Sequence, residues 1–207
     1  VQVGSQHRST PFKRRALEAI QGGVIGKVYS AKGLCYKRRV SIGHKADSPT
    51  PPGVNWDLFL GPAPRRPFNE LRFKYNWHWF WKTGNGDLNN QGTHQLDIAR
   101  WALDRDVTHP VRVMALGGRF QWNDQGETPN TMMGIAEYAN GQQVFFNVRN
   151  VPYKGYQTQV MNEYYFEDGG RISGGLYYPA GSSTGEKLDL PPGKVTPGGN
   201  WGAFVTA

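Results

Sequence analysis

The first part of the chain shows a helical spacing of apolar residues and then a strand-like alternation. Residues 11–21 begin with Pro11, which suits the first turn of a helix, and carry apolar side chains at helical spacing. A glycine pair then ends the pattern, as at many helix C-termini. Lys27 to Tyr36 alternates, with glycine interruptions. We therefore predict a helix over 11–21 and a strand over 27–36.

A loop and an aromatic segment follow this strand. Residues 41–67 are rich in Pro and Gly and contain one short helical pattern at 56–61. Aromatic residues alternate over 75–81, and in an extended chain the alternation would place four of them on one side: Tyr75, Trp77, Trp79 and Trp81. Alternating aromatics are most often core residues.

The second half of the chain predicts one long helix and then consecutive strands. The helix covers about Leu88 to Leu103, with Asp87 as its N-cap. Two turns rich in Gly, at 139–141 and 168–170, are typical of hairpins. The predicted strands are 111–122, 131–139, 142–150 and 158–167.

This order of elements predicts an α+β fold. A helix, a strand, a loop, a second helix and a run of strands favour an open-faced, mostly antiparallel sheet with helices packed on one face. The two ends of the chain suggest interrupted elements. Residues 1–4 have the pattern of the end of a buried strand, and 200–207 resemble the start of an amphipathic helix. We therefore expect a piece of a longer protein.

Composition excludes several classes of protein. The chain has 207 residues, of which one is Cys, so a disulfide scaffold or a multi-Cys zinc cluster is excluded. It contains 27 aromatic residues, enough for a sizeable core. No apolar run reaches the roughly 18–20 residues of a membrane span. We expect neither a membrane nor a nucleic-acid partner.

The net charge of +8 comes from one N-terminal block. Residues 1–45 hold ten Lys or Arg and one acid, whereas 46–207 hold fourteen Lys or Arg and fifteen acids. A basic block can attract nucleic acid, but no nucleic-acid motif accompanies this one. A solvated face, or one that meets another domain or a cofactor phosphate, is the interpretation that we favour.

One polar constellation lies on the helix at 87–103. Asp87, Asn90, His94 and Asp97 are spaced by 3, 4 and 3 residues, which places them on one face of a helix. His94 could act as a general base, with Asn90 or Asp97 fixing its tautomer. Spacing alone equally fits a polar helix face with no chemistry, which is the commoner case.

The remaining motifs point less clearly to a site. Trp residues around His78 could stack on a sugar, although such residues more often form a core. The five His show no ligand spacing on a helix, so we predict no metal site. No G-x-G-x-x-G follows a strand and no Walker-type lysine loop occurs. Cys35 is expected to serve packing.

Three segments together resemble one family. They are residues 20–28, with the sequence IQGGVIGKV, residues 55–64, with NWDLFLGPAP, and residues 84–97, with GNGDLNNQGTHQLD. In this order they resemble the glucose–fructose oxidoreductase / inositol dehydrogenase (Gfo/Idh/MocA) family, and the resemblance spans nearly the whole chain.

The resemblance implies a division of labour. In that family an N-terminal Rossmann domain binds NAD(P), and a C-terminal open-faced sheet supplies the substrate pocket and the subunit interface. Here residues 1–23 would be the end of the Rossmann domain and a connector helix, and 24–207 the C-terminal domain, truncated at its C-terminus. The chain begins after the phosphate loop, so we expect no tight NAD(P) binding by these residues alone.

The resemblance also implies roles for residues. His94 corresponds to the family's acid/base at a substrate hydroxyl. Asn90 stands where an Asp is frequent, and Asp87 lies a turn earlier. The substrate, a sugar or polyol, would contact a second set of residues: Trp77, His78, Trp79, Lys82 and Asp97. A homo-oligomer through the sheet face is expected.

Three functions therefore remain open. The first is the substrate-binding and catalytic-His half of an NAD(P)-dependent sugar or polyol oxidoreductase, inactive alone. The second is a cofactor-free carbohydrate-binding or oligomerisation module. The third is a carbohydrate-cleaving enzyme, which would need two carboxylates about 5–10 Å apart. Asp87 and Asp97, ten residues apart on one helix, would be roughly 15 Å apart, which argues against the third.

Overall fold

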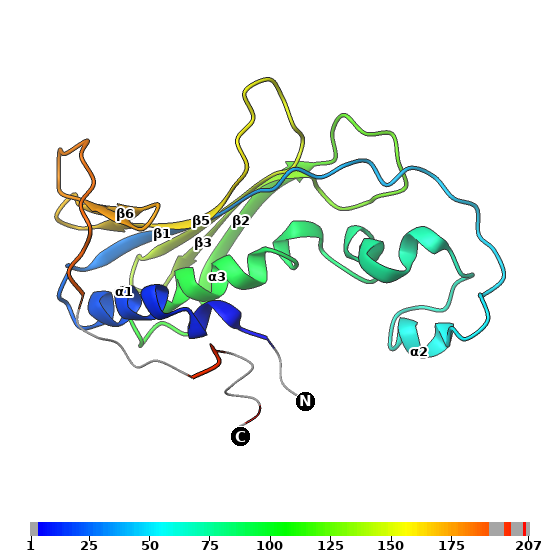
Figure 1. Cartoon of the computed structure of the whole chain (residues 1–207), viewed down its shortest axis with the longest axis horizontal. Helices are drawn as coiled ribbons and strands as arrows, with labels where there is room; N and C mark the ends of the chain where they lie inside the picture. The colour runs from blue at the N-terminus through cyan, green and yellow to red at the C-terminus, as the bar shows by residue number, and fades with distance from the viewer. Residues whose placement is uncertain (1–3, 191–196, 200–204, 206–207) are drawn as a thin grey trace.

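The computed structural model describes residues 4–190, 197–199 and 205. A seven-stranded sheet lies over helices α1 and α3, and an arm that contains α2 extends beyond one end of the sheet (Figure 1). The α-helices are α1 (Pro11–Gln21), α2 (Trp56–Leu60) and α3 (Gly92–Trp101). The strands are β1 (Val28–Tyr36), β2 (Pro110–Gly118), β3 (Thr131–Tyr138), β4 (Gln143–Arg149), β5 (Gln159–Phe166), β6 (Arg171–Ser173) and β7 (Leu176–Tyr178).

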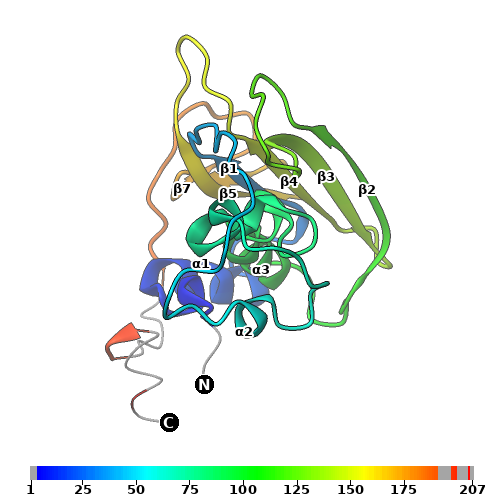
Figure 2. The same cartoon turned by 90° about the vertical axis from the view of Figure 1, so that its right-hand side faces the viewer.

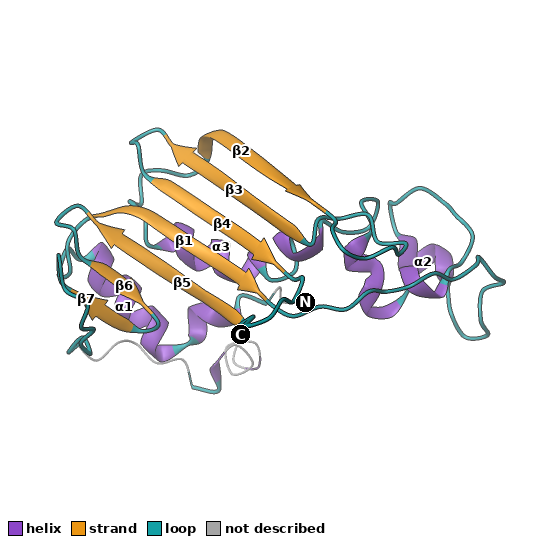
Figure 3. Cartoon of the chain, turned by 90° about the horizontal axis from the view of Figure 1, so that it is seen from above, coloured by secondary structure: helices purple, strands orange, loops and turns teal. Residues whose placement is uncertain are grey.

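The sheet is mixed but mostly antiparallel. Its strand order is β2-β3-β4-β1-β5-β6-β7, and only the β1–β4 pair is parallel (Figure 3). Hairpins join β3 to β4 and β5 to β6, because each pair is antiparallel and adjacent. The early strand β1 therefore sits in the middle of the later strands, which places residues just after β1 near the helix that precedes β2.

Helices α1 and α3 cover one face of the sheet and form the main core with it (Figure 2). Alternate residues of β4 point to this face, since Val144, Phe146 and Val148 are buried. At Gly33 in β1, an added Cβ would lie 3.0 Å from Gln95 of α3 and from the Phe146 ring. A side chain there would push α3 away, so glycine permits the close approach of helix and sheet.

The opposite face of the sheet is left without helices. The register gives its residues, because directly paired residues lie on the same face: Leu116 pairs with Met133, and Met133 with Asn147. Near the β2 edge this face exposes apolar side chains, among them Met114, Leu116 and Met133. Large exposed apolar patches are typical of interaction surfaces.

The arm has a small core of its own. Trp56, Leu60 and Phe68 are buried together, and the Trp56 ring stacks on Phe59 at 5.1 Å. Short 3₁₀ helices then follow at Glu70–Arg72, Lys74–Trp79 and Gly86–Leu88, and they lead the chain back to α3. The arm therefore positions its aromatic residues close to the start of α3.

Most of the predicted elements are confirmed. The α+β fold with helices on one face is present, α1 has the predicted bounds, and the predicted strands agree to within a few residues. The largest difference among them is at β2, which ends at Gly118 rather than at residue 122. The predictions for residues 1–3 and for most of 200–207 fall outside the described residues.

Candidate functional site

The polar constellation does not lie on one continuous helix. Gly86–Leu88 forms a 3₁₀ turn, and α3 begins only at Gly92 with Gln91 as its N-cap. The predictions that Asp87 is the N-cap and that the helix starts at Leu88 are therefore wrong. Gly86 adopts a φ of +63°, a left-handed conformation that breaks the helical path before Asp87. The four residues consequently separate into two groups.

The first group surrounds Asp87, whose side chain is fully buried. Arg39, three residues after β1, donates to both carboxylate oxygens, from Nη2 at 2.8 Å and from Nε at 3.2 Å. The Asn90 amide also donates to Asp87 Oδ1, at 3.2 Å. Burial opposes the charged guanidinium, but the hydrogen bond to Asp87 prevails and raises the pKa of Arg39. Asp87 is thus a paired, structural charge.

The same two donors meet again at Tyr75. Arg39 Nη1 and Asn90 Nδ2 each lie 3.0 Å from the Tyr75 hydroxyl oxygen. The Arg39 guanidinium also lies over the Tyr75 ring and over the buried Trp79 ring, at 5.7 and 5.1 Å from their centroids. Asn90 therefore holds Asp87 and Tyr75 rather than His94.

The second group surrounds His94, which is half-buried in the first turn of α3. Its ring lies 5.4 Å from that of His7, and within the described part of the chain its nitrogens make no hydrogen bond. The nearby Asp97 is occupied by Arg8, which donates to both carboxylate oxygens at 2.6 to 3.0 Å. Neither Asp97 nor Asn90 fixes the His94 tautomer in this geometry, so both nitrogens are open to a ligand.

His7 adds a further titratable group beside His94. Its Nδ1 lies 2.9 Å from Lys13 Nζ. Burial lowers the pKa of His7 to about 4, and the neighbouring Lys13 and His94 act in the same direction, while Asp97 opposes them. His7 is therefore neutral at pH 7. Burial also lowers the pKa of Lys13.

The aromatic segment is helical rather than extended. Lys74–Trp79 is a 3₁₀ helix, and Trp79 is buried whereas Trp81 is exposed. The prediction that Trp79 and Trp81 share one side is therefore wrong, because a three-residue turn does not preserve the two-residue alternation. The His78 ring stacks on Trp77, with centroids 3.8 Å apart.

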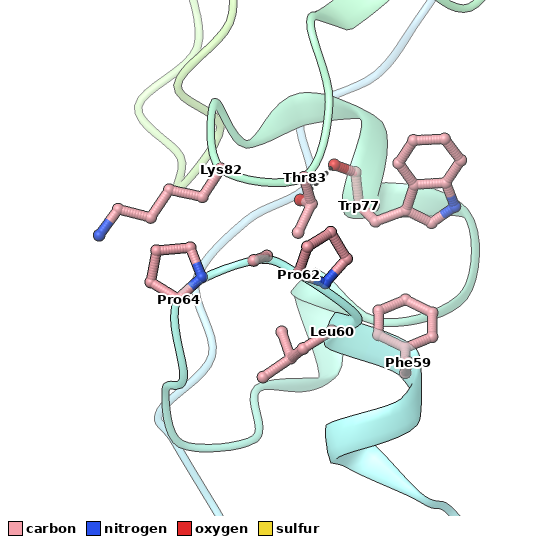
Figure 4. Close-up of a pocket in the computed structure, with 8 residues that line it drawn as sticks. Phe59, Leu60, Pro62, Pro64, Trp77, Lys82 and Thr83 are labelled. Carbon is pink, nitrogen blue, oxygen red and sulfur yellow. Dashed lines mark hydrogen bonds between the residues drawn. The ribbon is translucent and has the colours of Figure 1, made fainter.

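A pocket of about 570 Å³ opens in the arm. It lies between the Pro62–Pro64 loop and residues 82–83, with Trp77 on one side and the Lys82 chain extending on the other (Figure 4). Of the predicted substrate contacts, Trp77 and Lys82 line this pocket. Thr83 also lines the pocket, and its hydroxyl donates to the Trp77 carbonyl oxygen at 2.9 Å.

The single cysteine is not part of any reactive arrangement. Cys35 is fully buried in β1 and packs with Phe146 and Val148. Burial, followed by the nearby Asp87 charge, raises the pKa of its thiol to about 12. A thiol that stays protonated is a poor nucleophile, so Cys35 serves packing.

Sequence reasoning missed Arg39, Tyr75 and His7 as neighbours of the constellation. Arg39 was one cation of a basic block, and its pairing with Asp87 spans 48 residues. Nothing in a single sequence indicates such a distant partner. His7 lies in a 3₁₀ turn, Gln6–Ser9, before α1, and its place beside His94 depends on the contact of this turn with α3, which a single sequence does not show.

Two absences concern the described residues only. Among them no group of three or more His, Cys, Asp or Glu could hold a metal ion. None of the helices described is both long and apolar enough to cross a membrane.

Comparison with known proteins places the chain. Residues 20–162 match the model of the Gfo/Idh/MocA oxidoreductase family, C-terminal alpha/beta domain. The chain belongs to this family. No curated protein matches it. Among solved structures, levoglucosan dehydrogenase in complex with NADH and levoglucosan is similar, with a TM-score of 0.55 and 17% identity over 97% of this chain and 48% of that one.

Two further structures share the fold. The WlbA dehydrogenase from Bordetella pertussis, in complex with NADH and UDP-GlcNAcA, has a TM-score of 0.56 and 16% identity, over 92% of this chain and 44% of its own. An oxidoreductase domain protein from Kribbella flavida has a TM-score of 0.56 and 16% identity, over 92% of this chain and 46% of its own. The chain thus spans less than half the length of these three proteins, and at this identity the likeness concerns the fold.

Proposed function

We propose that this chain is the substrate-binding and proton-transferring half of an NAD(P)-dependent oxidoreductase that acts on a secondary alcohol of a sugar or polyol. The observation that carries the proposal is His94. The chain is a member of this family, and its His94 lies in the first turn of α3. Within the described residues, both nitrogens of the His94 imidazole are free of hydrogen bonds. The similar enzymes bound to NADH with levoglucosan or UDP-GlcNAcA support the substrate class.

The chemistry divides between this chain and a nucleotide-binding domain. A bound nicotinamide would accept the hydride from the carbinol carbon. These residues contain no phosphate loop, so a domain outside them would hold the cofactor. His94, as a neutral imidazole, would take the hydroxyl proton as the carbonyl forms, and would return it in the reverse reaction.

The substrate's remaining hydroxyls and ring would lie toward the arm. Trp77 and Lys82 line the pocket there, and a bound sugar would meet the Trp77 indole or the exposed Lys82 ammonium. An indole offers a flat apolar surface and an ammonium offers three donors, which suits a polyhydroxylated ring. His78, stacked on Trp77, would support this wall of the pocket.

The test is His94→Ala in the natural protein that contains these residues. Turnover of levoglucosan, L-sorbose, UDP-GlcNAcA, D-glucose and myo-inositol is followed with NAD⁺ and NADP⁺. Loss of a general base should lower kcat roughly 10²- to 10⁴-fold. The matched control is His109→Ala, an exposed histidine before β2, which should keep wild-type turnover. Normal turnover by His94→Ala contradicts the proposal.

The arm pocket favours a second candidate, a cofactor-free carbohydrate-binding module. It would need only the Trp77 wall and no redox partner. Calorimetry of the isolated chain with the same sugars tests it, and binding that Trp77→Ala abolishes, in a protein without redox turnover, supports it. A carbohydrate-cleaving site is disfavoured, because Arg39 and Arg8 occupy the Asp87 and Asp97 carboxylates.

The uncovered face of the sheet supports a partner as well. Its exposed apolar residues, Met114, Leu116 and Met133, lie on directly paired or neighbouring positions of β2 and β3. Burying such side chains against a second copy is favourable by about 25 cal/mol per Å² of apolar surface. The proposal therefore includes a homo-oligomer formed through this face.

A further inference from the structure

Two hydrogen-bond donors converge on the hydroxyl of Tyr75, and this arrangement assigns the residue a role. We propose, on the basis of the proposed function above, that the Tyr75 hydroxyl donates a hydrogen bond to a hydroxyl oxygen of the substrate. This oxygen is the neighbour of the hydroxyl that reacts at His94. Tyr75 would thereby select substrates with two neighbouring hydroxyls, such as sugars and polyols, over simple secondary alcohols.

The first step is the direction of the Tyr75 proton. A phenolic oxygen accepts at its lone pairs and donates one proton. Here Arg39 Nη1 and Asn90 Nδ2, each 3.0 Å away, both donate to that oxygen. The acceptor side of the hydroxyl is thus occupied. Among the described residues no group accepts the Tyr75 proton, and the residue is 49% exposed, so the proton is directed at solvent or at a ligand.

The second step is the rigidity of the frame. Asp87 is fully buried, and burying a carboxylate is costly unless it is paired and hydrogen-bonded. Its oxygens hold Arg39 and Asn90, and each of these two side chains donates a further N–H to one partly exposed hydroxyl, that of Tyr75. A buried charge therefore serves to fix a surface donor. A hydrogen-bond donor that is already held in position loses little conformational freedom when it binds a ligand.

The third step is the position of Tyr75 relative to His94. Asn90 precedes His94 by four residues, and Asn89 and Gln91 on either side of Asn90 both have right-handed helical dihedrals, so the turn that carries Asn90 leads directly into the first turn of α3, where His94 lies. Tyr75, bonded to Asn90 at 3.0 Å, therefore lies at the same end of α3 as His94. Adjacent hydroxyl oxygens on a sugar ring lie close together, so a single sugar bound at this end of α3 would present two of them at once. One hydroxyl at His94 would place the next within reach of Tyr75.

The experiment compares a sugar with its own deoxy analogues. The natural protein and its Tyr75→Phe variant are assayed with the best sugar of the panel above and with each of its monodeoxy analogues. Tyr75→Phe keeps the ring contacts with His78 and Arg39 and removes only the hydroxyl. We expect kcat/KM to fall about ten-fold for the parent sugar but less than two-fold for one deoxy analogue, because that analogue lacks the partner oxygen. An equal fall for all analogues, or no fall, overturns the proposal.

The control is Tyr29→Phe. Tyr29 lies in β1, is 50% exposed like Tyr75, and its hydroxyl makes no hydrogen bond within the described part of the chain. This variant should keep the wild-type ratio of kcat/KM between sugar and analogues.

A binding measurement separates this inference from the proposed function. A ¹³Cζ-labelled tyrosine placed at position 75 alone reports on its hydroxyl by NMR without any substitution. If no panel sugar is oxidised, the proposed redox function fails, yet a shift of the Tyr75 resonance on adding a panel sugar still supports Tyr75 as a sugar-binding donor. Absence of that shift with every panel sugar overturns the inference.

Discussion

At the scale of single residues, the site depends on groups whose neighbours come from distant parts of the chain. His94 and Asn90 were predicted from their spacing in one motif. Arg39 and Tyr75 were not, because their role arises from contacts that the fold creates across 48 and 15 residues. Asp97 was expected at the substrate, yet its carboxylate is held by Arg8. Sequence therefore indicated the residues of the motif, but not which of them are occupied by partners.

His7 should make stability depend on pH. Its pKa is lowered to about 4 in the fold by burial, Lys13 and His94, from 6.5 when unfolded. Between pH 6.5 and 4 the unfolded chain binds a proton that the folded chain does not, so stability falls as pH decreases through this window. The loss should be no more than about 3 kcal/mol. His7→Asn should flatten the decrease in Tm between pH 7 and 4.5, whereas the exposed His44→Asn should not; equal slopes in both variants would contradict this role of His7.

At the scale of elements, the alternation and the helical spacing of apolar residues predicted the strands and the helix that pack into the core. The strands β3, β4 and β5 and the helix α1 were predicted nearly to the residue, because each buries one regular face. The prediction failed at the 3₁₀ segments Lys74–Trp79 and Gly86–Leu88. The turn at Gly86–Leu88 begins with a left-handed glycine and contains the buried Asp87 pair, and Lys74 has a positive φ of 51° at the start of the other segment, which are features of tertiary structure. The parallel pairing of β1 with β4 was likewise not contained in the local pattern.

Gly86 should tolerate a side chain much less well than a glycine in an open turn. Its φ is +63°, and an added Cβ would lie 2.8 Å from Thr128 Oγ1 and 3.0 Å from Thr128 Cβ. Gly86→Ala therefore combines backbone strain with a clash. Gly141 in the β3–β4 turn has a φ of +84° but nothing within 4 Å of an added Cβ. Strain alone should cost Gly141→Ala about 1 kcal/mol, and Gly86→Ala should cost at least about 1 kcal/mol more. Urea denaturation measures both, and similar losses would show that the clash is relieved.

At the scale of the whole molecule, one face of the sheet is covered by the helices that carry the proposed site, and the other face is without helices. The helices and the arm lie on the covered side, so oligomer formation through the uncovered face would leave His94 and the arm pocket accessible (Figures 1 and 3). The sequence predicted this two-sided arrangement correctly, since a sheet with helices on one face has a second face to cover. It could not show that the exposed apolar residues concentrate at the β2 edge, which depends on strand order.

Leu116 tests the partner face directly. Its side chain is 84% exposed on β2, opposite Met133, and an apolar interface would bury both. Leu116→Lys places a charge there, and removing a charge from water without a partner costs more than the apolar contact gains. Leu58 is 79% exposed on α2, away from the sheet, so Leu58→Lys is a control of equal chemistry. Light scattering coupled to size-exclusion chromatography should show oligomers for the wild type and for Leu58→Lys, and monomers for Leu116→Lys. Because His94 and the arm pocket lie on the covered side of the sheet, the monomeric variant should retain any sugar binding; a wild-type protein that is already monomeric would refute the interface.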